Sequence, residues 1–600
     1  MRCYEQRILG LQTNKATIMK YRIFLCLTFS LFILNCSSEK ANESKNYTTT
    51  FENSNGTETP TYKEVLDYYF VLAKDFSTVN IQTFGETDSG YPLHVVTFNS
   101  EGNFNFKKQP DAKLKLLINN GIHPGESDGI DATMLLFRDL AQGKIAAPKN
   151  TLISTIPIYN IGGALNRNSN SRTNQNGPVS YGFRGNARNY DLNRDFIKND
   201  TKNAQSFAQI YHAIQPHVFV DNHVSNGADY QYTLTHLFTQ HNKLGGELGN
   251  YQENSFMPKL EQSLAEKKWD ITPYVNVFNS VPEKGFSQFM DYPRYSTGYT
   301  TLWNSIGLMV ETHMLKPYKQ RVEGTYELLK SLIEISDIEH QQIADLRTRA
   351  FEKQQQQNYY PLQWKIDTTQ IKTLKFKGFE GEIIPSNVTG FPRLKYNKER
   401  PFTKEVAYQN TMIATDSVRI PAAYVLRKGQ HAIIPFLERN NIVFNTLKTD
   451  TMLQVERYKI NTYNTRNNAY EGHYLHYNTT VAPTVATIPF TAGDFIIPTN
   501  QEGMRYLMET LEPGATDSFF NWNFFDTILQ QKEGFSPYVF EEIAEELLLN
   551  NPEIKTAFEA KKTADVAFAK NWYAQLDWLH KQSAHYESAH LQYPVYRILK

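Results

Sequence analysis

Apolar and polar positions follow two different rhythms along this chain of 600 residues. Between residues 60 and 355, short apolar runs such as 113–120 and 151–160 alternate with stretches of helical spacing such as 129–143 and 201–214. Strands that alternate with helices in this way are typical of an α/β sheet with mainly parallel strands. The pattern predicts a three-layer α/β/α sandwich with a mixed, largely parallel central sheet.

The rhythm changes after a Gln-rich stretch near 354–358. Residues 360–500 contain short segments of alternating polarity, which predict a β-rich accessory module. Residues 501–600 have mainly helical spacing and are expected to form a helical C-terminal region. The sequence assigns no task to either region.

The first 59 residues predict export and a tether. A short basic region at 19–22 precedes twelve mostly apolar residues and then Cys36, so residues 1–36 read as a signal peptide too short to span a bilayer. A cysteine directly after the apolar core resembles a bacterial lipoprotein signal, with Cys36 as the lipidated residue. Residues 37–59 are rich in Ser, Thr, Asn and Glu, which predicts a flexible tether.

These features place the protein outside the cytoplasm. We expect a lipoprotein of the bacterial cell envelope, at the outer membrane, in the periplasm or on the cell surface. It would touch the membrane only through its lipid anchor, and it would be secreted if Cys36 is not lipidated.

Composition excludes several classes of function. The chain has 62 basic and 62 acidic residues, so no excess of positive charge argues for nucleic-acid binding. Its three cysteines all lie at or before position 36, which excludes disulfides and thiolate metal sites from the folded domains. The oligomeric state is left open.

Candidate metal chemistry begins with His123-Pro124-Gly125-Glu126, between an apolar run with strand character and a helix start. A histidine and a carboxylate three residues apart can bind one zinc ion, and catalytic zinc usually takes three protein ligands. His223 supplies a third at the carboxyl end of the strand-like run 218–221, where open α/β sheets place ligands. His212 and His217 are the alternative third ligands. His212 lies in a helical stretch and His217 lies before the strand, which favours structural roles for both.

Two further segments add polar groups that suit catalysis. Asp191, Asn193 and Asp195 share one side of a segment expected to be extended. An aspartate there can hold a zinc-bound imidazole from behind, and Asn193 with Arg194 can grip a carboxylate. Glu311 ends an apolar strand, where an unpaired charge is costly to bury without a role.

As an ordered set, these motifs resemble the zinc carboxypeptidases of family M14, the carboxypeptidase A-like metallopeptidases, over roughly residues 60–350. The resemblance is to a large bacterial member of lipoprotein type. It implies that His123, Glu126 and His223 bind one Zn²⁺ ion per chain and that Asp191 backs the first histidine.

The same resemblance implies the catalytic and substrate-binding residues. Asn193 and Arg194 bind the substrate's terminal carboxylate, and Glu311 is the general base. Arg172 is our choice for the arginine that polarises the scissile carbonyl, with Arg167 and Arg184 as alternatives. Tyr295 is our choice for the tyrosine that closes over the substrate, with Tyr292 and Tyr299 as alternatives.

The resulting hypothesis is a zinc-dependent metallocarboxypeptidase that uses zinc-activated water to remove C-terminal residues from peptides with a free terminal carboxylate. The alternatives are a related zinc amidase or deacylase, including a cell-wall peptide amidohydrolase, and a non-catalytic peptide-capture lipoprotein. No HExxH occurs, so the common helical zinc-protease arrangement is absent, and no phosphate-binding glycine loop supports nucleotide binding.

Overall fold

The computed structural model describes residues 46–110 and 113–600. Thr48–Lys600 forms one compact unit. Cys36 and the predicted signal peptide lie outside the described residues. Among the described helices, none combines the length and apolar character needed to cross a membrane.

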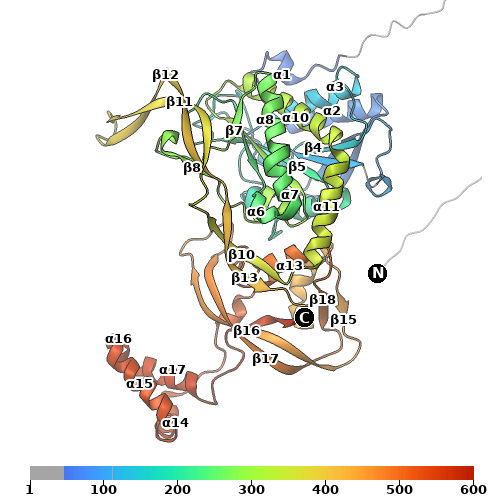
Figure 1. The fold of residues 1–600 in the computed structure, drawn as a ribbon. Coiled ribbons are helices and arrows are strands. Elements are labelled where there is room, and N and C mark those ends of the chain that lie inside the picture. Colours follow the sequence, from blue (N-terminus) through green and yellow to red (C-terminus); the bar gives the residue numbers. More distant parts are fainter. Residues whose placement is uncertain (1–45, 111–112) are drawn as a thin grey trace, which may run out of the picture. The chain divides into compact units, whose positions relative to one another are not determined.

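An eight-stranded mixed sheet forms the centre of the N-terminal half (Figure 1), with the strand order β1-β2-β4-β3-β5-β9-β6-β7. Neighbours from β4 through β3 and β5 to β9 are parallel, as are β6 and β7, whereas β1, β2 and β4 pair antiparallel, as do β9 and β6. The bounds are β1 (Val79–Glu86), β2 (Pro92–Phe98), β3 (Leu114–Asn119), β4 (Thr151–Ile156), β5 (Val218–Ser225), β6 (Leu234–Phe238), β7 (Ile271–Pro273) and β9 (Ile306–His313). The predicted sheet is confirmed.

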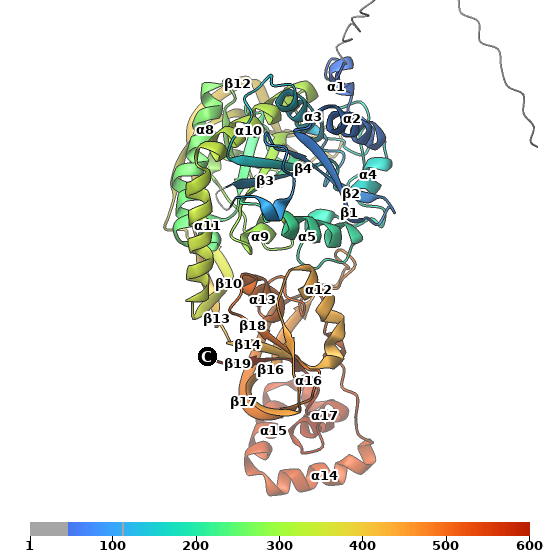
Figure 2. The ribbon, with the colours of Figure 1, turned by 90° about the vertical axis from the view of Figure 1, so that its right-hand side faces the viewer.

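Helices cover both faces of this sheet. Figure 2 shows α3 and α10 above it and α5 and α9 below it. The helices of this half, apart from the single turns, are α2 (Tyr62–Asp75), α3 (Asp128–Ala141), α5 (Lys202–Ile214), α7 (Gly246–Tyr251), α8 (Met257–Glu266), α9 (Ser296–Thr301), α10 (Tyr318–Ile338) and α11 (His340–Gln355). The three-layer α/β/α architecture is therefore confirmed.

The central strands are continuous apolar runs because helices bury them from both sides. Leu114, Leu116, Leu117 and Ile118 of β3 are all fully buried. Each such side chain contributes roughly 1.5–3 kcal/mol relative to an exposed position. This core fixes the carboxyl ends of β3, β5 and β9 against one another, and these ends carry the site described below.

The segment before α2 is ordered where the sequence predicted a flexible tether. Residues 50–53 form a helical turn, α1 (Thr50–Asn53), whose capping box joins Thr49 and Glu52. Phe51 is buried, and the Glu52 carboxylate accepts a hydrogen bond from Arg138 at 2.7 Å. The polar composition suggested a tether, but one buried aromatic ring and one ion pair hold residues 49–53 to the folded body.

Residues 359–498 contain both long and short strands, which belong to three further sheets (Figure 1). These strands are β10 (Tyr359–Ile366), β11 (Lys372–Pro385), β12 (Pro392–Gln409), β13 (Met412–Arg419), β14 (Ala423–Leu426), β15 (Asn445–Thr446), β16 (Thr451–Thr465), β17 (His476–Phe490) and β18 (Phe495–Pro498). A short strand of the first half, β8 (Phe286–Ser287), pairs with β12. The β-rich character expected of this region is observed, and the module boundaries stay predictions.

The last hundred residues contain helices, irregular segments and one strand. They form α13 (Met504–Leu511), α14 (Pro537–Asn550), α15 (Pro552–Ala564), α16 (Val566–Ala569) and α17 (Trp572–Gln582). The chain then returns as β19 (Gln592–Ile598), which lies between β14 and β16 in a six-stranded sheet. Its alternation of apolar and polar residues is too short to have distinguished it from a helix end.

Candidate metal centre and active site

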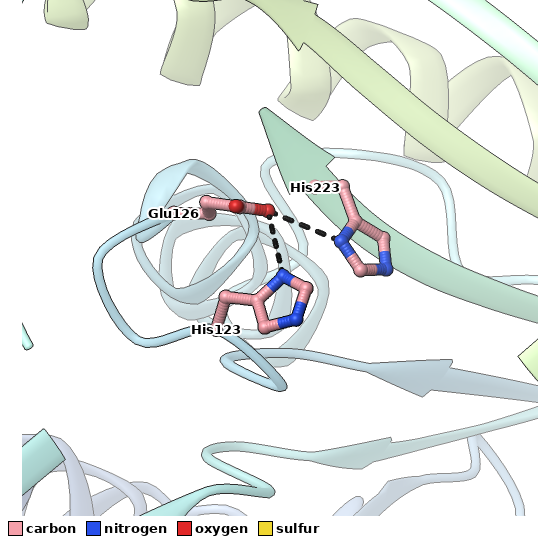
Figure 3. Close-up of side chains that lie close together, drawn as sticks. All are labelled: His123, Glu126 and His223. Carbon is pink, nitrogen blue, oxygen red and sulfur yellow. Dashed lines mark hydrogen bonds and ion pairs between the residues drawn. The ribbon is translucent and has the colours of Figure 1, made fainter. Parts of the chain in front are cut away.

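His123, Glu126 and His223 converge at the carboxyl ends of β3 and β5 (Figure 3). One ligand atom from each lies within 4.8 Å of the others, and all three side chains are buried. His123 Nδ1 is 3.3 Å and His223 Nδ1 is 3.1 Å from the same oxygen, Oε2 of Glu126. The structure therefore brings the three predicted ligands together.

The outer nitrogens of both histidines face carboxylates. His123 Nε2 lies 2.9 Å from Asp191 Oδ1, and His223 Nε2 lies 3.0 Å from Asp221 Oδ2. An imidazole that donates from Nε2 presents an acceptor lone pair at Nδ1 when it is neutral. Two such lone pairs and a carboxylate oxygen at one point form a set of acceptors that suits a cation, and the His₂Glu combination suits zinc.

Asp221 was missed in the sequence, although a signal was present. Asp221 and His223 are two apart on β5, so their side chains lie on the same side of the strand. Asp221 also accepts a hydrogen bond from Asn119 at 3.0 Å, which fixes its position. The motif Asp-Asn-His thus supplies both a ligand and its supporting carboxylate.

Glu126 accepts hydrogen bonds on both of its carboxylate oxygens. Oε1 accepts a hydrogen bond from Arg172 at 2.8 Å, and Oε2 accepts one from the backbone N–H of Val224 at 3.0 Å. Burial alone would raise the pKa of Glu126, but His123 and Arg172 lower it well below its ordinary value. The carboxylate is therefore ionised and able to bind a metal ion.

Glu311 lies beside this cluster because β9 pairs with β5 so that Glu311 is directly opposite His223. Burial raises its pKa to about 8, with His223 opposing and the charge of Glu126 adding to the shift. Its Oε2 has no hydrogen-bond partner in the described part of the chain. A carboxyl group of this kind is a candidate for proton transfer.

The cluster of His123, Glu126 and His223 opens into a cavity of about 630 Å³. Asn193 and Arg194, the expected carboxylate-binding pair, both line this cavity. Arg194 donates to the carbonyl of Asn193 at 2.8 Å, and its guanidinium lies 4.7 Å from the ring centre of Tyr295. The planar cation is thus supported on an aromatic face, next to the cavity.

The segment carrying these two residues is a 3₁₀ turn, Leu192–Arg194, so the expectation of an extended segment was wrong. The Asp191 carboxylate accepts from the backbone N–H of Asn193 at 3.0 Å and caps the turn. Asp195 points elsewhere, because it is fully buried and pairs with Lys198 at 2.7 Å. Only Asp191 and Asn193 of the three alternating residues reach the site.

The candidate arginines separate clearly. Arg172 and Arg184 both line the cavity, whereas Arg167 donates to the carbonyls of Thr59 and Pro60 outside it. Arg184 donates to Asp191 at 2.8 Å, and its Nη1 lies 3.6 Å from Glu126. Its side chain is 45 % exposed, against 19 % for Arg172.

The candidate tyrosines separate as well. Tyr292 and Tyr295 line the cavity, and Tyr299 is buried away from it with its hydroxyl on Asn440 at 2.7 Å. Tyr274 also lines the cavity and was missed. Burial raises its pKa, and the nearby carboxylate of Glu311 adds to the shift. Its position directly after β7, at the end of a sheet strand, was the available signal.

The two alternative histidines lie outside the cluster. The ring of His212 packs edge-on against Trp303, and His217 accepts from the backbone N–H of Lys115 at 3.1 Å. Burial lowers the pKa of both, so each is a neutral core histidine.

Comparison with known proteins agrees with this geometry. Residues 67–231 match the family model Peptidase_M14, described as zinc carboxypeptidase. This region belongs to the M14 zinc carboxypeptidase family. The M14 match contains the three clustered metal-binding candidates together with Asp191, Asn193 and Arg194, and it ends before Glu311.

Individual relatives of the M14 region are distant. "Carboxypeptidase 2" of Trichophyton rubrum is 24% identical over 249 residues, which are 38% of this chain and 43% of that protein. The chain thus covers less than half the length of this curated relative. Two solved structures are similar over part of the chain. A metallo-carboxypeptidase from Burkholderia cenocepacia has 16% identity, TM-score 0.36 and coverage of 46% of this chain and 70% of its own. Carboxypeptidase A from Helicoverpa armigera has 13% identity and a TM-score of 0.36, and the match covers 47% of this chain and 74% of that one.

Proposed function

We propose that the protein is a zinc-dependent metallocarboxypeptidase that removes residues from the C-termini of peptides. The observation that carries this proposal is the His₂Glu cluster with Glu311 at its side and the Asn193–Arg194 turn in the same cavity. A zinc ion bound by the cluster supplies the Lewis acidity that amide hydrolysis needs near neutral pH.

Glu311 is the proposed general base. A carboxylate at this position accepts a proton from the attacking water and delivers it to the leaving amine. Burial raises the pKa of Glu311 to about 8, near enough to neutrality for the group to take up and release a proton in one cycle.

Asn193 and Arg194 are the proposed clamp for the substrate's terminal carboxylate. A guanidinium offers two parallel donors that match the two oxygens of a carboxylate. Holding the terminus there places the last peptide bond, rather than an internal one, at the metal cluster. This requirement for a free terminus separates a carboxypeptidase from an amidase.

The two cavity arginines are proposed to divide their roles. Arg172 is occupied by Glu126 and Gln175, so it positions a metal ligand. Arg184 is more exposed and its charge lies close enough to Glu311 to affect that group's pKa. We therefore favour Arg184, one of the two alternatives considered from the sequence, for stabilising the oxygen of the scissile carbonyl.

The proposed place of action is the cell envelope, with anchoring through a lipid on Cys36. Support comes from the sequence alone, in the basic and apolar segments before that cysteine. Replacing Cys36 with Ala should move the protein from the membrane fraction to the soluble fraction of a lipoprotein-processing bacterial host. An unchanged membrane fraction would contradict the anchor.

The decisive test of the activity uses two peptides that differ only at the terminus, one with a free carboxylate and one with an amide. With zinc, the free acid should lose residues one at a time from its C-terminus, and a chelator should stop the reaction. Equal cleavage of the amide would favour the amidase alternative. Binding without release of any residue would favour peptide capture.

A further inference from the structure

The C-terminal half of the chain supplies part of the cavity wall. Thr516 lines the cavity together with residues of the M14 region. Its neighbour Asp517 is fully buried and pairs with Arg294, which also lines the cavity. These two partners are 223 residues apart in sequence.

The contact between Asp517 and Arg294 uses three donors. Arg294 Nε donates to Asp517 Oδ1 at 2.8 Å, and Arg294 Nη2 lies 2.7 Å from the same oxygen. The backbone N–H of Arg294 donates to Asp517 Oδ2 at 2.9 Å. Trp522 Nε1 also donates to Oδ1 at 3.2 Å, and the guanidinium lies 5.0 Å from the Trp522 ring centre. Both oxygens of Asp517 are therefore engaged, and the pair is fixed in one geometry.

A second contact holds the same region to the proposed clamp. The backbone N–H of Asp191 donates to the Glu471 carboxylate at 2.9 Å. Two residues later in the chain, His473 lies 2.7 Å from Asp200. The C-terminal half therefore touches the M14 region on both sides of the turn that carries Asn193 and Arg194.

The charge of Arg294 is the feature that needs explaining. Among the charged residues described in the cavity lining, Glu126 belongs to the His₂Glu cluster and Arg172 holds Glu126, Arg184 and Glu311 lie beside the cluster, and Arg194 is the proposed clamp. None of these roles is assigned to Arg294.

The remaining lining combines polar side chains with apolar and aromatic ones, and the latter include Phe278, Phe289, Met290, Tyr292 and Tyr295. An unpaired guanidinium among these side chains would attract an acidic substrate side chain.

We propose that Asp517 is a specificity-determining residue: by neutralising Arg294 it makes the pocket select an uncharged aromatic or long apolar C-terminal side chain. This inference rests on the proposed carboxypeptidase function. The aromatic and thioether walls favour such side chains by burying their apolar area. An acidic or a basic side chain would enter a pocket whose opposite charge is already paired.

The test compares kcat/KM for three peptides that differ only in the last residue, Phe, Glu or Lys, using the zinc-loaded full chain. The wild-type protein should prefer Phe to both charged residues. Asp517→Asn releases Arg294 and should raise the Glu-to-Phe ratio at least tenfold. Arg294→Gln leaves the carboxylate of Asp517 unpaired and should raise the Lys-to-Phe ratio instead.

The double variant Asp517→Asn/Arg294→Gln removes both charges and should restore the wild-type order of preference. His473→Gln is the matched control, because it changes a polar contact between the C-terminal half and the M14 region without touching the cavity lining. Circular dichroism of each variant shows whether it has folded.

Three outcomes would overturn the inference. They are a wild-type preference for Glu or Lys, unchanged ratios in folded single variants, and the same shift in the His473 control. If the wild-type protein releases no residue from any of the three peptides, the proposed function fails instead, so the two failures are distinguishable.

Discussion

Arg172 donates a hydrogen bond to Oε1 of Glu126 at 2.8 Å, while the other oxygen of that carboxylate faces both histidines of the cluster. One oxygen is thus fixed by a cation and the other is left for a metal ion. Such outer partners orient a ligand and adjust its strength as a donor. The relationship makes the affinity for zinc depend on a residue that does not itself bind the metal.

Arg172→Met should lower the affinity for zinc about 10- to 100-fold, because the Glu126 carboxylate loses the contact that orients it. Competition with a chromophoric chelator measures this directly. Arg167→Met is the control, since Arg167 binds backbone carbonyls outside the cavity and its loss should leave zinc affinity unchanged. Equal affinities in wild-type and Arg172→Met protein would contradict the positioning role.

Glu311→Gln should keep zinc bound while kcat falls by about 10²- to 10⁴-fold, because the amide cannot accept a proton. Metal content by elemental analysis and single-turnover hydrolysis give the two quantities. A variant that turns over near the wild-type rate would show that another group is the base.

Arg194→Met should raise KM for free-acid peptides more than it lowers kcat, because Arg194 is expected to hold the terminal carboxylate in both ground and transition states. Steady-state kinetics with a short peptide measure the two parameters separately. Arg188→Met is a suitable control, because the half-exposed Arg188 packs on Tyr190 and is not among the residues that line the cavity. If only kcat changed in Arg194→Met, the clamp assignment would need revision.

A buried acid behind the site predicts a pH effect on stability. Burial raises the pKa of Asp131 to about 7, although hydrogen bonds from Thr59 and Tyr318 oppose the shift. The folded state therefore keeps its proton while the unfolded chain, with its pKa near 3.8, releases it. The free energy of unfolding should fall as pH rises from about 4 to about 7 and then level off.

Asp131→Asn keeps an acceptor for both hydroxyls and removes this titration. The stability of the variant relative to wild type should be higher at pH 8 than at pH 5, by an amount on the order of a few kcal/mol. Thermal unfolding at the two pH values measures the gap in Tm. The exposed Asp67→Asn should show the same gap at both, and a constant gap for Asp131→Asn would refute the shift.

The sequence determined the sandwich and the region that carries the site. Apolar runs such as 114–119 can be buried only between two layers of helices, so their rhythm fixes the architecture before any contact is known. His123, Glu126 and His223 could be identified because strand ends in such a sheet converge on one edge. The order of the M14 motifs along the chain then assigned roles to residues whose individual signals are weak.

Tertiary structure decided what depends on contacts between distant segments. Arg172 and Arg184 are both plausible in the sequence, and only packing shows that one holds Glu126 while the other stays open to the cavity. Asp517 carries no local signal at all, since its meaning lies in an arginine 223 residues away. Periodicity records which face of an element is buried, but the partner across that face is set by how the chain folds back, which no local pattern contains.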